Sequence, residues 1–252
     1  GVPHHVTLAS GTSLNFNANN YPREMRGDLT INSSSTFALS TASGGDLYIK
    51  GNWNRSNAGG FTNNNRLVKF NGTGGTQVIT VTGGGTETFA YLAIEKSAGQ
   101  SLQLAAAPNA TNVTVNGATG GNSFQMISGD LDLNQRTFTF TSHFNGFQNN
   151  LGIDGSVGNL VRTINSTGGQ GTFNIINTNA GNNVVTVTRM SANASTLIVG
   201  ANAIMAISSS SGPSGINLGS GLSTINGTLQ FNNFGYAVGN SPNYGTGSFL
   251  VY

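Results

Sequence analysis

The carboxylates that could do chemistry occur in a short recurring motif. Asp28, Asp46 and Asp130 each stand between a glycine and a leucine. If Asp28 and Asp46 lie on adjacent coils of a repeat, their carboxylates stack about 5 Å apart and repel one another unless a cation separates them. Calcium, which prefers oxygen ligands, would suit that position. The simpler interpretation, which we favour, is that each aspartate bonds to backbone within its own turn.

Asp130 and Asp132 form a second candidate, because residues two apart on a strand face the same side. Both aspartates are weak calcium candidates, and a carboxylate pair can also hydrolyse glycosidic bonds. The chain has only eight acidic residues, and no cluster of acids and bases converges in the sequence. The alternative is that the pair keeps a sheet face soluble. We therefore expect no enzymatic activity, no catalytic residues and no cofactor, with calcium as the one candidate ion.

Three aromatic residues could stack on sugar rings, since each has an apolar face and a polar tip. These glycan-contact candidates are Trp53, Tyr48 and Tyr91. In a solenoid, however, aromatic side chains also stack on one another between coils. The chain has no cysteine, which excludes disulfides, zinc–thiolate sites and thiol catalysis.

The elements that position these residues are short strands. Segments that read apolar–polar–apolar recur along the chain, which is the period-two pattern of half-buried strands. Glycine and asparagine, which tolerate tight turns, lie between them. No long segment has helical periodicity. Clear examples of the strand pattern are Leu29-Thr30-Ile31, Leu47-Tyr48-Ile49, Val113-Thr114-Val115, Phe138-Thr139-Phe140 and Leu229-Gln230-Phe231.

One motif, Gly-x-Leu-x-apolar-Asn or lysine, begins at Gly27, Gly45, Gly129 and Gly227. Its first two copies begin 18 residues apart, and a unit this short must stack on its neighbours to bury a core. The sequence therefore predicts an all-β, right-handed parallel β-helix with coils of roughly 20 residues, forming a single domain over residues 1–252. Because some predicted strands begin 11 to 13 residues apart, a β-sandwich is the alternative.

Charge and hydropathy exclude two classes of partner. Charged residues make up 7% of the chain, the net charge is +2, and no basic stripe suitable for phosphates is present. We therefore expect no nucleic-acid binding. No apolar run approaches the roughly 20 residues of a transmembrane helix, so we also expect no membrane span.

The segment Phe70-Asn71-Gly72-Thr73-Gly74-Gly75-Thr76-Gln77-Val78-Ile79, followed by Phe89-Ala90-Tyr91-Leu92-Ala93-Ile94-Glu95-Lys96, resembles a known kind of repeat. It is similar to the repeat regions of large secreted surface proteins of the Bacteroidota, many of which are type IX secretion cargo. The resemblance implies a secreted or cell-surface location and an adhesin-like, largely β-helical architecture. It brings no catalytic residues with it.

These observations lead to two functional hypotheses. The first is an extracellular structural or adhesive β-solenoid, either a fragment of a longer surface adhesin or the subunit of a self-associating fibre. Uncapped strand edges at the solenoid ends would template that association, and a glycan or a host or cell surface is a further possible partner. The alternative is a carbohydrate-binding or polysaccharide-degrading β-helix.

Overall fold

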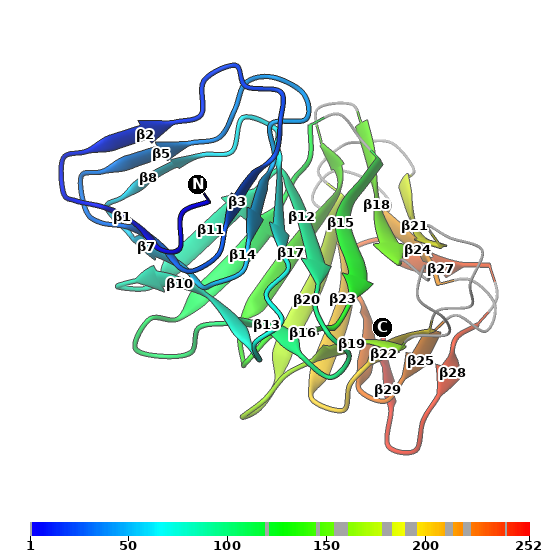
Figure 1. Ribbon diagram of the computed structural model, residues 1–252. Helices are drawn as coiled ribbons and strands as arrows, with labels where there is room; N and C mark the ends of the chain where they lie inside the picture. Colours follow the sequence, from blue (N-terminus) through cyan, green and yellow to red (C-terminus); the bar gives the residue numbers. More distant parts are fainter. Residues whose placement is uncertain are drawn as a thin grey trace.

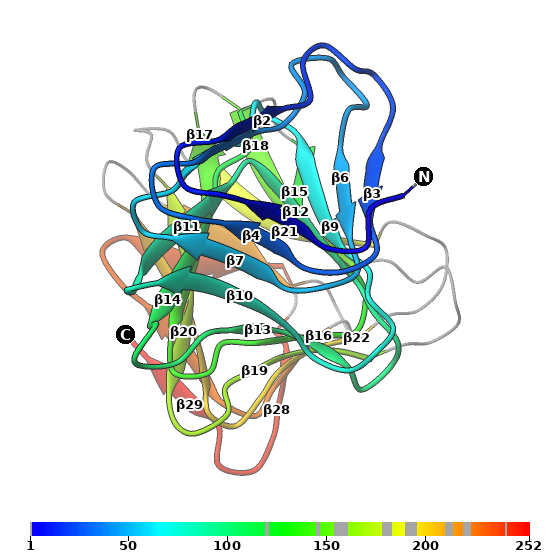
Figure 2. The same cartoon turned by 60° about the vertical axis from the view of Figure 1, so that its left-hand side comes forward.

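The computed structural model describes residues 2–118, 121–144, 147–153, 161–177, 183–189, 196–209, 214–218, 223–239 and 241–252. In these residues the protein is all β, and no helix is present that could cross a membrane. Parallel strands stack along one axis as a β-solenoid, from the N-terminal coils to the C-terminal coils (Figures 1 and 2). The predicted β-helix is confirmed, and the β-sandwich alternative is wrong.

The solenoid has three faces, because strands pair with the strand three positions further along the chain, apart from one break on the second face. The first face contains β1 (Val6–Leu8), β4 (Leu29–Ile31), β7 (Trp53–Ser56), β10 (Gln77–Thr82), β13 (Ser101–Leu104), β16 (Asp130–Asp132), β19 (Val161–Asn165), β22 (Thr196–Val199), β25 (Ser223–Ile225) and β28 (Asn243–Tyr244). The second contains β2 (Ser13–Asn15), β5 (Thr36–Ala38), β8 (Gly60–Thr62), β11 (Gly85–Phe89), β14 (Thr111–Val115), β17 (Thr137–Phe144), β20 (Gly171–Asn177), β23 (Ala203–Ser209), β26 (Thr228–Phe231) and β29 (Phe249–Val251). The third contains β3 (Arg23–Met25), β6 (Leu47–Ile49), β9 (Leu67–Phe70), β12 (Tyr91–Glu95), β15 (Gly121–Ser128), β18 (Phe147–Ile153), β21 (Asn183–Arg189), β24 (Ser214–Asn217) and β27 (Gly235–Val238).

Two irregularities interrupt this arrangement. At the edge shared by the second and third faces, β17 and β18 also form a short antiparallel pair. On the second face, β8 pairs with β5 and β11 pairs with β14, but β8 and β11 do not pair with each other in the described ladders. The second face is therefore divided between its third and fourth strands.

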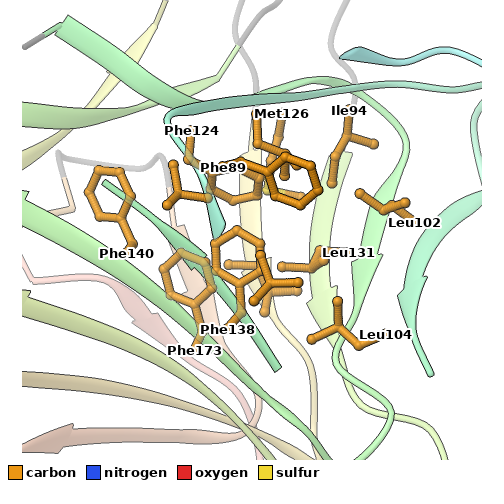
Figure 3. Close-up of a cluster of buried hydrophobic side chains, with 14 of the residues drawn as sticks. Phe89, Ile94, Leu102, Leu104, Phe124, Met126, Leu131, Phe138, Phe140 and Phe173 are labelled. Carbon is orange, nitrogen blue, oxygen red and sulfur yellow. The ribbon is translucent and has the colours of Figure 1, made fainter. Parts of the chain in front are cut away.

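The core lies inside the coil and is filled from all three faces. Alternate residues of each strand point inward, so Leu29 and Ile31 are fully buried while Thr30 between them is half-buried. Rings of phenylalanine from neighbouring coils stack along the axis, with Phe138 and Phe173 5.3 Å apart between centroids. Figure 3 shows the middle of this core, where the labelled side chains are Phe89, Ile94, Leu102, Leu104, Phe124, Met126, Leu131, Phe138, Phe140 and Phe173.

The coils are longer than the spacing of the sequence motif. Equivalent positions on the first face are 24 residues apart between Leu29 and Trp53, and 35 apart between Ile164 and Val199. The reason is that the motif marks the start of a strand on any face. Its copies at Gly27 and Gly45 precede β4 and β6, which are two strands of the same coil. The 18-residue spacing thus covers two of the three sides of a coil, and a full turn includes the third side as well.

Candidate functional site

The three motif aspartates bind backbone amides of the following coil. In each case a carboxylate oxygen accepts a hydrogen bond from the residue that lies one coil further on in the ladder register. The pairs are Asn52 N to Asp28 Oδ1 at 2.6 Å, Leu67 N to Asp46 Oδ1 at 3.0 Å and Thr163 N to Asp130 Oδ1 at 2.7 Å. Each aspartate therefore links two coils at a corner, where the regular ladder begins.

The favoured interpretation, in which each aspartate bonds backbone within its own turn, is wrong, because the three acceptors bind amides of the next coil. The alternative, in which Asp28 and Asp46 stack on adjacent coils, is wrong as well. They precede β4 and β6 of one coil and so lie on different faces. Asparagine performs the same task elsewhere, since Asn52 Oδ1 accepts from Val78 N at 2.8 Å and Asn112 Oδ1 accepts from Thr137 N at 2.9 Å. A neutral amide suffices for this bond, so the motif position requires no cation. Across the described part of the chain, no three histidine, aspartate or glutamate side chains are grouped to hold a metal ion.

The glycine of the motif is required by close packing at the corner. A Cβ on Gly27 would lie 2.3 Å from the carbonyl oxygen of His4, and one on Gly45 would lie 2.1 Å from that of Asn19. Both contacts are with backbone of the preceding coil, which cannot move aside as a flexible side chain could. The glycine thus contacts the coil before it, and the aspartate binds the coil after it.

Asp130 and Asp132 occupy different environments. Asp132 is 5% exposed and accepts hydrogen bonds from Asn134 N, Thr167 N, Thr167 Oγ1 and Gln103 Nε2 at 2.7–3.0 Å. Burial pushes the pKa of Asp132 upward, but these hydrogen bonds outweigh it and hold the pKa below its ordinary value. Burial raises the pKa of Asp130. Both oxygens of Asp132 are occupied by these hydrogen bonds. Asp130 and Asp132 are therefore poorly placed to act together on a glycan.

Trp53 is not available to stack on a sugar, because it is completely buried. Its ring packs edge-on against Phe61 and Phe89, with centroids 4.7 and 5.2 Å away. The stacking of aromatic side chains between coils, which was the alternative, therefore describes Trp53. Tyr48 and Tyr91 are half-buried. The Tyr48 ring has Lys69 Nζ 4.2 Å from its centroid, and the Tyr91 ring lies over Gly117.

A buried charged group that the sequence did not reveal lies where the second face is divided. Glu87 in β11 is 2% exposed, and its Oε2 accepts from Trp53 Nε1 and Arg55 Nε, each at 2.7 Å. Arg55 also donates to the carbonyls of Gly59 and Thr86. The carboxylate thus binds side chains of the preceding coil at a point where β8 and β11 exchange no ladder bonds. The contacts span 32 to 34 residues in sequence, and no motif marks them.

Lys96 is a second buried ionisable group that the sequence did not reveal. It is 2% exposed and donates to the carbonyl oxygen of Gly72 at 2.8 Å and to Gln77 Oε1 at 3.0 Å. Burial lowers the pKa of Lys96 to about 8. Among the ion pairs of the described residues, none involves Lys96. Its ammonium therefore satisfies backbone and amide oxygens at a corner where three coils meet.

The two ends of the solenoid expose strand edges and apolar core. At the N-terminal end, β1, β2 and β3 each have one paired neighbour, and a cavity of about 670 Å³ is lined by Val6, Leu14, Phe16 and Met25 among others. At the C-terminal end, β27, β28 and β29 are the last strands of their faces. A cavity of about 330 Å³ there includes Leu229, Phe231, Leu250 and Tyr252 in its lining. In β29 and the residue after it, Phe249 is 65% exposed and Tyr252 is 90% exposed.

Comparison of the chain with protein-family models, with curated proteins and with solved structures gives no match. The geometry described above is therefore the basis for a functional proposal.

Proposed function

We propose that the protein is an extracellular structural and adhesive β-solenoid that associates end to end with a second solenoid of the same kind. The partner is another copy of this chain or a neighbouring repeat of a longer surface protein. Catalysis and a resident cofactor are not part of the proposal. The extracellular location rests on the resemblance to secreted surface repeats.

The observation that carries the proposal is the match between the two open ends. All the ladders along the axis are parallel, apart from the short β17–β18 pair. A copy translated along the axis therefore presents β1 and β2 to β28 and β29 with the strand direction preserved. On the third face, which has one strand fewer, β27 ends one coil earlier than β28 and β29. Unpaired parallel edges of this kind accept further strands. A head-to-tail contact between different surfaces does not close on itself and produces open chains.

Apolar surface at both ends supports the same arrangement. Phe16 and Leu14 at one end, and Phe231 and Leu250 at the other, line the open core where the next coil would pack. Exposed apolar clusters of this kind mark interaction surfaces. Burying them against the next coil would continue the hydrophobic column that runs through the molecule.

Sedimentation velocity and negative-stain electron microscopy over a range of protein concentrations test the proposal. We expect end-to-end oligomers in the wild type and a shift to monomers in Leu250→Lys, which places a charge in the open C-terminal core. Val78→Lys is the matched control, because Val78 lies on the outer side of β10 in the middle of the first face. Wild-type protein that stays monomeric at high concentration would contradict end-to-end association.

A further inference from the structure

A groove on the second face has no assigned role. It crosses β17, β20, β23 and β26 on their outer side and has a volume of about 510 Å³, within the roughly 300–1,000 Å³ of ligand-binding cavities. Its lining consists of Thr137, Thr172, Asn174, Ala206, Ser208, Gln230, Asn232 and Asn233. It lies on the side wall of the solenoid and is separate from the cavities at the two ends.

The groove exists because a small residue stands between two long ones. Ala206 on β23 pairs in register with Asn174 on β20 and with Gln230 on β26. Adjacent strands lie about 4.8 Å apart, so the two amide side chains flank a methyl group across three coils. The notch therefore runs across the strands, along the solenoid axis.

The lining is rich in hydrogen-bonding groups and has no charge. Ser208 Oγ donates to Asn174 Oδ1 at 3.0 Å, and Gln230 Nε2 donates to Asn232 Oδ1 at 2.8 Å. These bonds orient the two flanking amides. Asn174 Nδ2 and Gln230 Oε1 have no hydrogen-bond partner among the described residues, so one flank offers a donor and the other an acceptor.

We propose that this groove binds an uncharged polysaccharide chain lying along the solenoid axis. Sugar hydroxyls both donate and accept, which matches the flanking amides and the threonine hydroxyls of the lining. A charged ligand would lose hydration without gaining a counter-charge. A peptide added as a strand needs an unpaired edge, and β20, β23 and β26 are paired on both sides. The proposal goes beyond end-to-end association and does not depend on it.

Affinity electrophoresis tests this inference with native gels that contain dextran, laminarin, xylan or mannan. We expect at least one of these neutral polysaccharides to retard the wild type. Asn174→Ala and Gln230→Ala each remove one flanking amide and should weaken that binding by roughly tenfold. Ala206→Gln fills the notch without removing any polar group and should have at least as large an effect.

The matched control is Asn54→Ala, which removes an outer amide from β7 on the first face and should leave the retardation unchanged. Thermal unfolding of every variant establishes that each is folded at the temperature of the gel. Three results would overturn the proposal: no retardation in any neutral gel, retardation that survives Ala206→Gln in a folded protein, or retardation only in a gel containing dextran sulfate. The end-to-end proposal would be unaffected by any of them.

Discussion

At the scale of the residue, the Gly-Asp-Leu motif combines three tasks at one corner. Glycine permits contact with the preceding coil, aspartate accepts an amide of the following coil, and leucine enters the core. Asn52 and Asn112 show that a neutral amide can replace the carboxylate. The hydrogen bonds between coils therefore account for the aspartates of the motif without a cation.

Replacement of Asp46 tests this interpretation. Asp46→Ala leaves the amide of Leu67 without its acceptor and should lower the free energy of unfolding by about 1–2 kcal/mol. Asp46→Asn keeps an acceptor and should cost less than half as much. Urea denaturation with and without EDTA provides the measurement. Equal losses in the two variants, together with destabilisation by EDTA, would favour a calcium site instead.

Because of Lys96, we expect the free energy of unfolding to increase as the pH becomes alkaline. Its folded pKa of about 8 lies below its ordinary value, so the folded state releases a proton that the unfolded chain retains. The cost of burying the charge is therefore fully present below about pH 8 and disappears as the pH rises towards about 10. Between about pH 7.5 and about pH 9.5, the wild type should gain about 2 kcal/mol relative to Lys96→Met. Urea denaturation at both pH values checks this, and parallel pH profiles for the two proteins would contradict it.

At the scale of the element, the strands could be predicted from the sequence. The way in which they assemble into coils could be predicted only in part. The segments Leu29–Ile31 and Leu47–Ile49 were found from their alternation alone and are strands β4 and β6. The length of the coil was not predictable from the motif, because the same residues begin strands on different faces. The hydrogen bonds from Trp53 and Arg55 to Glu87 form only because coils distant in sequence stack on one another. The local periodicity of the sequence therefore cannot predict them.

The Arg55–Glu87 ion pair joins two coils at the point where β8 and β11 exchange no ladder hydrogen bonds. Arg55→Met leaves the Glu87 carboxylate buried with the indole of Trp53 as its main side-chain partner, so we expect a loss of about 3 kcal/mol in the free energy of unfolding. Adding Glu87→Gln removes the buried charge and keeps an acceptor for Trp53, which should recover more than half of that loss. Chemical denaturation of the single and double variants measures the coupling. A double variant no more stable than Arg55→Met would show that the charge is not the cause.

At the scale of the whole molecule, the parallel β-helix followed from short strands, turn residues and a unit too small to fold alone. The surfaces on which the proposals rest did not follow, because they depend on strand register. The groove, for example, needs Asn174, Ala206 and Gln230 side by side. These residues are 32 and 24 positions apart in sequence. No local pattern distinguishes them from other polar positions on the outer side of a strand.

Protection from hydrogen exchange should vary along the axis. Central strands such as β14 and β20 have a neighbour on each side, whereas β1 and β28 have one. Amides of the end coils should therefore exchange faster than those of the middle, since a smaller opening exposes them. Hydrogen–deuterium exchange followed by mass spectrometry checks this, and the end coils should become protected at concentrations where oligomers form. Uniform protection along the chain would contradict the expectation.

The direction of the ladders also determines how the protein responds to mechanical force. β1 and β28 are at opposite ends of the first face, and the hydrogen bonds between coils run along the axis that joins them. A pull between the two ends loads these bonds in tension a few at a time, so coils would peel away one after another. A 24-residue coil such as that from Leu29 to Trp53 releases about 80 Å of extended chain. As a tether, the protein would therefore lengthen in steps under load and absorb work without breaking a covalent bond.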